Sequence, residues 1–183
     1  MTRPLRKDAA DRRRALLDAA RAVFAEDGID APLERIAGRA GVGRATLYRN
    51  FPRWTEIALA VLLDDMAELA ERFAESDDPE VFLRFIEALS ERLVRNTALG
   101  GVVRAAPSPD ILKPLRAAMV QAATPALKVS QAADVVRADL TPADMRVLAA
   151  MLGSGLHNAA PAERSAIARR SLELVVDAIR IRP

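Results

Sequence analysis

The sequence contains no cysteine, and this absence excludes disulfide bonds, thiol catalysis and thiolate metal sites. Its one histidine, His157, has no second histidine or cysteine to complete a zinc-type site, so no metal is expected. Aromatic residues make up only 4% of the chain. The core must therefore consist mostly of leucine, valine, isoleucine and alanine, a composition that favours helices over strands.

Long apolar runs are also absent, since none approaches the ~20 residues that a membrane helix needs. The first residues are charged and include no apolar segment, so we expect no signal peptide and a cytoplasmic protein without membrane contact. The sequence lacks a glycine-rich phosphate-binding loop, and a lone histidine offers little for acid–base catalysis. We therefore expect neither an enzyme nor a cofactor.

Positive charge is concentrated at the front of the chain. Residues 1–55 contain twelve basic and seven acidic side chains, a net charge of +5, whereas residues 56–183 contain fifteen and eighteen, a net charge of −3. This asymmetry indicates a polyanionic partner for the front segment alone. A basic surface that contacts only solvent would give the same charge asymmetry.

The front segment has the pattern of three helices. Residues 9–27 place apolar side chains at helical spacing, and Gly28 is a suitable stop. Two short helices are predicted next, over 32–40 and 44–50, and the sequence GVG at 41–43 separates them. Two short helices joined by a tight glycine-containing turn form a helix-turn-helix.

Helical patterns continue through the rest of the chain. They predict helices over 53–74, from Val81 to about 98, over 125–137, from Thr141 and from Pro161, with a short helix and loops over 102–123. We therefore predict an all-α protein with an N-terminal helix-turn-helix domain (1–55) and a C-terminal helical domain (56–183).

The segment LERIAGRAGVGRATLYRNF, residues 33–51, resembles the DNA-binding domain of the TetR family of bacterial transcriptional regulators. The matching features are IA at 36–37, GV at 41–42, TLY at 46–48 and Phe51, with a long helix on either side. The resemblance implies an all-α homodimer whose three-helix N-terminal domain binds a double-stranded DNA operator. It also implies that the C-terminal helical bundle binds a small-molecule effector and forms the dimer interface.

The second short helix would be the recognition helix, whose N-terminal residues approach base edges in the major groove. Arginine can pair with guanine or phosphate, alanine and threonine permit close approach, and the tyrosine hydroxyl can reach a phosphate. Arg49 has an alternative partner in Glu34, and Arg53 stands one position ahead of the usual family cation. The predicted DNA contacts are Arg44, Ala45, Thr46, Tyr48, Arg49 and Arg53.

The C-terminal domain gives weaker signals. Its large flexible or aromatic side chains are candidates for an effector pocket, although such residues also fill ordinary cores: Met66, Phe73, Phe82, Phe85, Met119, Met145 and Met151. The last two helices are apolar on more than one side, which predicts a second packing partner. The candidate dimer residues are Leu148, Leu152, Leu156, Ile167, Leu174 and Val175.

The residues and the TetR resemblance together lead us to expect a ligand-responsive transcriptional regulator, a repressor that binds its operator as a homodimer and is released by an effector. Its residues do not distinguish repression from activation. The alternative is a helical protein-interaction module whose basic N-terminal face binds an acidic protein, and preference for one duplex sequence over another would separate the two.

Overall fold

A computed structural model of the chain describes residues 3–29, 31–104 and 108–181, and within these ranges it contains helices and no β-strand. The predicted all-α class is therefore confirmed. Packing between helices divides the chain into two units, Met1–Leu62 and Leu63–Pro183. The division falls inside helix α4 (Trp54–Phe73), seven residues beyond the boundary expected after residue 55.

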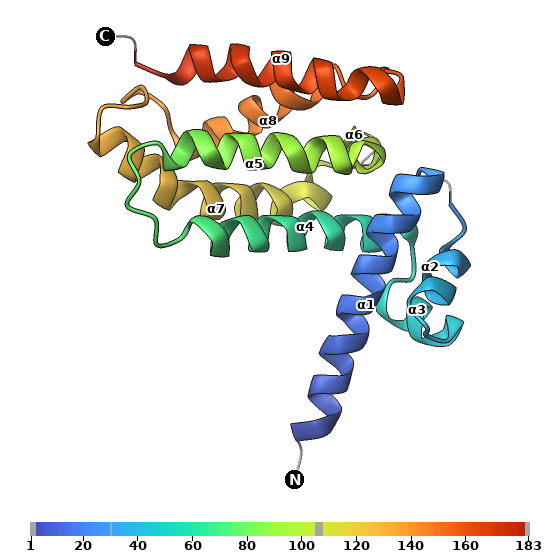
Figure 1. Ribbon diagram of the computed structural model, residues 1–183. Coiled ribbons are helices and arrows are strands. Elements are labelled where there is room, and N and C mark those ends of the chain that lie inside the picture. The colour runs from blue at the N-terminus through green and yellow to red at the C-terminus, as the bar shows by residue number, and fades with distance from the viewer. Residues whose placement is uncertain (1–2, 30, 105–107, 182–183) are drawn as a thin grey trace. The chain divides into compact units, whose positions relative to one another are not determined.

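The first unit contains α1 (Arg3–Asp27), α2 (Leu33–Arg39), α3 (Arg44–Asn50) and the first part of α4 (Figure 1). Helix α1 begins at Arg3 rather than at residue 9. It ends where predicted, because Gly28 adopts a φ of +79°, the left-handed conformation in which glycine ends helices.

The core of the first unit lies along one side of α1. Leu16, Ala20, Val23 and Phe24 are almost fully buried there. Helices α1, α2 and α3 pack together, and the apolar side chains that α2, α3 and the following residue bury are Ile36, Ala37, Leu47 and Phe51. Burial of these side chains stabilises two helices that are too short to persist alone.

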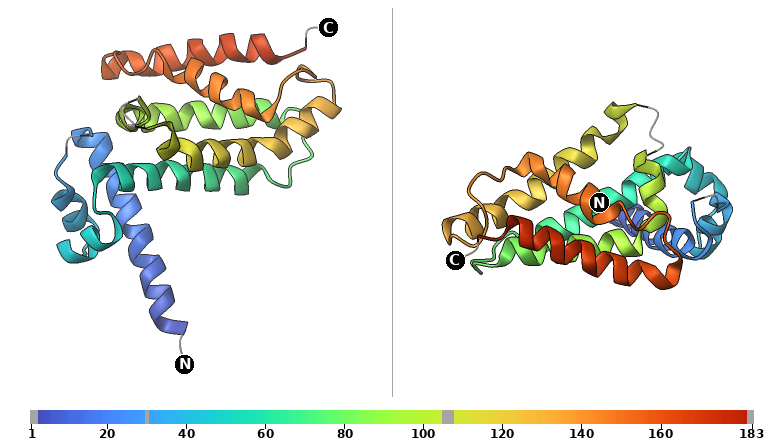
Figure 2. Two further views of the ribbon diagram at one scale, coloured as in Figure 1. Left: turned by 180° about the vertical axis from the view of Figure 1, so that it is seen from behind. Right: turned by 90° about the horizontal axis from the view of Figure 1, so that it is seen from above.

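The second unit is a helical bundle. It contains the remainder of α4 and the elements α5 (Val81–Arg95), η1 (Thr97–Leu99), α6 (Gly100–Arg104), η2 (Pro109–Leu112), α7 (Lys113–Ala132), η3 (Pro142–Asp144), α8 (Met145–Gly153) and α9 (Pro161–Ile179). Helix α5 is the central element, since it packs against α7, α8 and α9, as the views in Figure 2 show.

Helix α7 departs from the prediction. Pro125 was expected to begin a helix over 125–137, but it lies in the interior of α7, which begins at Lys113 and ends at Ala132. A proline there removes one helical N–H, and the side chain remains exposed. Burial of the neighbouring Ala122, Ala126 and Leu127 in the bundle keeps the helix continuous through this position.

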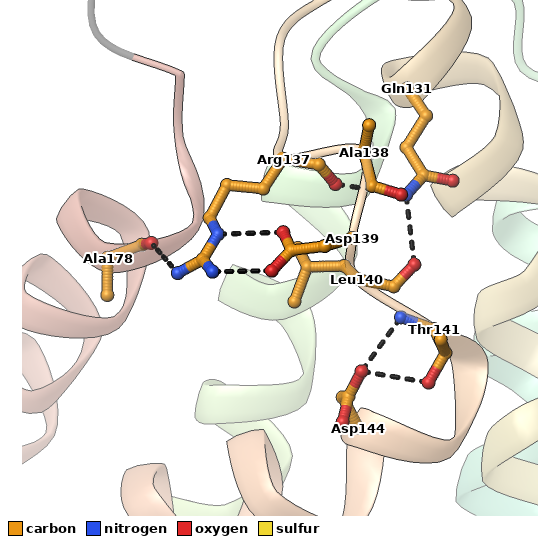
Figure 3. A network of polar contacts seen from close by, with 8 residues as sticks. All are labelled: Gln131, Arg137, Ala138, Asp139, Leu140, Thr141, Asp144 and Ala178. Carbon is orange, nitrogen blue, oxygen red and sulfur yellow. Dashed lines mark hydrogen bonds and ion pairs between the residues drawn. The ribbon is translucent and has the colours of Figure 1, made fainter.

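The loop between α7 and α8 is held by a network of polar contacts (Figure 3). Gln131 donates its side-chain amide to three main-chain carbonyl oxygens of the loop. Arg137 forms a two-bond ion pair with Asp139, at 2.9 and 2.6 Å. A helix is predicted from Thr141, and there Thr141 and Asp144 cap η3: the Thr141 amide donates to the Asp144 carboxylate at 2.8 Å.

A buried ionic cluster joins α4 to α5 within the second unit. The side chain of Asp65 is only 3% exposed, and it accepts hydrogen bonds from Arg92, at 3.0 Å, and from the amide of Asn96. Arg92 also pairs with the more exposed Glu68 at 2.8 Å.

Among the described residues, no helix combines the length and apolar character that crossing a bilayer requires.

Candidate nucleic-acid interface

The turn between α2 and α3 has the geometry of a helix-turn-helix. Gly41 adopts a φ of +65°, which a side-chain-bearing residue adopts only with strain. The Val42 amide then donates to the carbonyl of Ala37 at 3.1 Å, which folds the chain back over the end of α2. Gly43 is the N-terminal cap of α3, whose bounds are those predicted from the sequence.

Helix α3 is buried on one side and exposed on the other. Leu47 is fully buried, whereas Arg44, Ala45, Tyr48 and Arg49 are exposed, and Thr46 is half-buried. The predicted contact residues of α3 therefore lie on or beside its solvent-facing side, as a helix that enters a groove requires.

The arginines of α2 and α3 fall into two groups. On α2, Arg35 pairs with Asp27 at 2.5 Å and Arg39 pairs with Glu26 at 2.7 Å, so the end of α1 neutralises both. On α3, neither Arg44 nor Arg49 forms a salt bridge with another described residue. The two arginines of α3 thus keep their hydrogen-bond donors for an external anion or a base edge.

Arg53, the remaining predicted contact, lies between α3 and α4. Its guanidinium pairs with Glu56 at 3.2 Å and is 76% exposed. Exposed pairs of this kind contribute little to stability. Arg53 can therefore exchange Glu56 for another anion at small cost.

Tyr48 has a partner that the sequence did not indicate. Its hydroxyl donates to the carboxylate of Glu34 on α2 at 2.8 Å, so Glu34 binds Tyr48 rather than Arg49. This hydrogen bond lowers the pKa of Glu34, and the nearby Arg44 charge contributes to the shift. The same bond raises the pKa of Tyr48, which keeps the phenol protonated above its ordinary range.

The effector candidates of the second unit are mostly core residues. Phe85 contacts Phe73 edge-on, with 5.7 Å between ring centroids, and stacks on Phe82 at 6.4 Å. Met66 and Met145 are buried, Met119 is half-buried and Met151 is exposed. An open hollow of about 480 Å³ lies between α5 and α9, and none of the seven candidates lines it.

The candidate dimer residues divide between core and surface. Leu148, Leu152, Leu156 and Val175 are buried inside the unit itself. Leu174 on α9 is 52% exposed, and Ile167 is half-buried. Sequence reasoning missed Val147 on α8, which is also exposed and lies one helical turn from the exposed Met151.

No group of His, Asp or Glu side chains suited to holding a metal ion occurs within the described ranges.

Known proteins share parts of this sequence and this architecture. The sequence profile of the family "Bacterial regulatory proteins, tetR family" matches residues 16–61. An uncharacterised helix-turn-helix transcriptional regulator of Mycobacterium tuberculosis is 36% identical over 88 residues, which are 47% of this chain and 47% of that protein. The match thus spans about half the length of that relative.

Two solved structures match nearly the whole chain. A TetR transcription regulatory protein of Mycobacterium vanbaalenii has a TM-score of 0.69 and 26% identity, and the match covers 97% of this chain and 100% of the other. A TetR transcriptional regulator of Streptomyces coelicolor also has a TM-score of 0.69, with 30% identity over 93% of this chain and 99% of that one. The helix-turn-helix geometry, the matched profile and the whole-chain similarity together show that this chain belongs to the TetR family of bacterial transcriptional regulators.

Proposed function

We propose that the chain is a cytoplasmic, ligand-responsive transcriptional repressor that binds an operator as a homodimer through α3. The observation that carries the DNA interface is the pair of arginines on α3, Arg44 and Arg49. They are exposed and form no salt bridge with other described residues, whereas the arginines of α2 are paired with α1.

Each exposed residue of α3 has a distinct role in this proposal. Arg44, at the start of the helix, pairs with guanine O6 and N7. Ala45 contacts a thymine methyl, and Thr46 offers a hydroxyl and a methyl to a base or a phosphate. Tyr48 and Arg49 contact phosphates and fix the register of the helix on the duplex. Outside α3, Arg53 contacts a phosphate after leaving Glu56.

The experiment is selection of bound duplexes from a random pool at physiological salt. Enrichment of an inverted repeat, with half-sites about one helical turn apart, supports both DNA recognition and two-fold symmetry. Arg44→Ala should relax preference at particular base pairs. Arg84→Ala is the control, because it removes the same charge from an exposed position on α5, outside the proposed DNA and dimer surfaces. Salt-sensitive binding without enrichment refutes the proposal and favours the interaction module instead.

For the homodimer, we propose that a second copy covers the exposed apolar side chains of α8 and α9. Val147, Met151 and Leu174 are 49%, 45% and 52% exposed, and large apolar side chains gathered on two adjacent helices mark an association surface. Leu174→Glu should shift the sedimentation of the chain toward the monomer. Ile111→Glu, at an exposed apolar position outside these helices, should leave it unchanged.

For effector release, we propose linkage between the two sites. An effector that binds the second unit weakens operator binding only if it has different affinities for the DNA-bound and released states. A reporter gene under the selected operator gives the sign of control. Reporter expression that falls when the regulator is deleted would contradict repression.

A further inference from the structure

The hydrogen bond between Tyr48 and Glu34 lies on the exposed side of the helix-turn-helix. Tyr48, on α3, is 41% exposed, and Glu34 is half-buried in the first turn of α2. The Tyr48 hydroxyl and a Glu34 carboxylate oxygen are 2.8 Å apart. The bond therefore joins the two helices next to the arginines that are proposed to meet DNA.

Glu34 differs from the other acidic groups around this motif. It is the one acidic residue in the sequences of α2 and α3, whereas those helices contain four arginines. Glu26 and Asp27, at the end of α1, are held by guanidinium groups, but the bond that holds Glu34 comes from a neutral hydroxyl. A full negative charge thus remains on a face of otherwise positive character.

Hydrogen-bond stoichiometry sets a condition on any contact with phosphate. A phenol has one proton to donate, and a phosphate oxygen in DNA can only accept. While Tyr48 donates to Glu34, it has no proton left for a phosphate. Tyr48 must therefore release Glu34 before its hydroxyl can donate to a phosphate, and the released carboxylate then lies near a second anion.

We propose that Glu34 is an affinity-setting residue of the DNA interface, whose carboxylate competes with a backbone phosphate for the Tyr48 hydroxyl. This inference rests on the proposed DNA-binding function. Because the competition involves a phosphate and no base, Glu34 weakens binding to every duplex by a similar factor. It also hides the contribution of the Tyr48 hydroxyl, because removing the hydroxyl abolishes one hydrogen bond in the free protein and one in the complex.

The hydrogen bond itself is measured without DNA. Tyr48 is the one tyrosine of the sequence, so the ultraviolet absorbance of tyrosinate reports its ionisation alone. Glu34→Ala should lower the pKa of Tyr48 toward its ordinary value, and Glu34→Gln should lower it by less, because the amide oxygen still accepts the bond. Circular dichroism over the same pH range verifies that the helices persist. An unchanged titration in Glu34→Ala overturns the proposal at its first step.

The competition is measured by a double-mutant cycle on DNA. Glu34→Ala should tighten binding to the selected operator and to an unrelated duplex alike, by about tenfold, the value of one charge-assisted hydrogen bond. Tyr48→Phe should change affinity by less than about threefold in the wild-type chain but weaken it about tenfold in the Glu34→Ala background. The matched control is Glu75→Ala, which removes the same charge at an exposed position in the second unit.

The outcomes separate this inference from the proposed function. If the wild-type chain prefers one duplex sequence but Glu34→Ala binds no tighter than Glu75→Ala, this proposal fails and the proposed function stands. Equal effects of Tyr48→Phe in both backgrounds also refute the competition. If the wild-type chain shows no sequence preference, the proposed function fails and this inference fails with it, whatever the tyrosine titration shows.

Discussion

The buried ion pair between Asp65 and Arg92 supports a quantitative prediction for the second unit. Arg92→Ala leaves the Asp65 carboxylate, which is only 3% exposed, with the Asn96 amide but without its guanidinium, and such a loss costs about 3–5 kcal/mol of unfolding free energy. Asp65→Ala should cost less, about 2 kcal/mol, because Arg92 is 17% exposed and keeps Glu68 at 2.8 Å. The two substitutions should therefore lower the unfolding free energy by different amounts, although they break the same ion pair.

The double variant distinguishes this reasoning from simple loss of packing. Once both charges are gone, the cost of burying the Asp65 carboxylate without Arg92 disappears, so Asp65→Ala with Arg92→Ala should cost less than the two single losses combined, by about 2 kcal/mol. Urea unfolding followed by far-ultraviolet circular dichroism measures the three free energies. All samples need the same protein concentration, because association would shift apparent stability. Additive losses, or a larger loss for Asp65→Ala than for Arg92→Ala, would refute the assigned burial energetics.

Three further predictions concern the first unit and the cap of η3. Gly41→Ala should lower the unfolding free energy by about 1 kcal/mol. The cause is backbone strain alone, since an added Cβ meets no atom within 4 Å. Gly43→Ala, at a φ of −69°, should not lower the unfolding free energy through such strain. Arg49→Ala should reduce the slope of log affinity against log salt by about 1, equally on operator and unrelated duplexes, and a base-specific loss would contradict a phosphate contact. The Thr141 amide lowers the pKa of Asp144, so the stability that this cap contributes is present above the unfolded pKa and is lost as pH falls through the lower, folded value. The difference in unfolding free energy between the wild-type chain and Asp144→Asn should therefore be constant near neutral pH and shrink only in acid; a difference that shrinks above pH ~6 would contradict it.

The features that the sequence predicted well depend on local backbone chemistry. Gly28 and Gly41 adopt left-handed conformations that few other residues tolerate, so the end of α1 and the turn before α3 could be read from their positions. Thr141, with proline after it, likewise marked the start of the helical segment that begins as η3 and continues as α8. Each signal acts within a few residues and needs no knowledge of packing.

The features that it did not predict depend on contacts between distant residues. Pro125 is a helix breaker by local chemistry, but burial of its neighbours on the bundle side of α7 outweighs one missing hydrogen bond. The bond from Tyr48 to Glu34 joins residues fourteen positions apart, and it depends on how α2 and α3 are rotated about their axes. Spacing along the chain could bring Glu34 near Tyr48 or Arg49 and could not choose between them.

The junction between the α7–α8 loop and the end of α9 restricts how the second unit can deform. Arg137 donates its amide to the carbonyl of Ile179, and Ile181 donates its amide to the carbonyl of Val135, both at 3.0 Å. The Arg180 side chain adds an ion pair to Glu80 just before α5, also at 3.0 Å. Axial sliding of α9 would break all three contacts together. We therefore expect α9 to resist sliding along its axis more strongly than tilting about its C-terminal end, away from which the Pro161 end lies farthest.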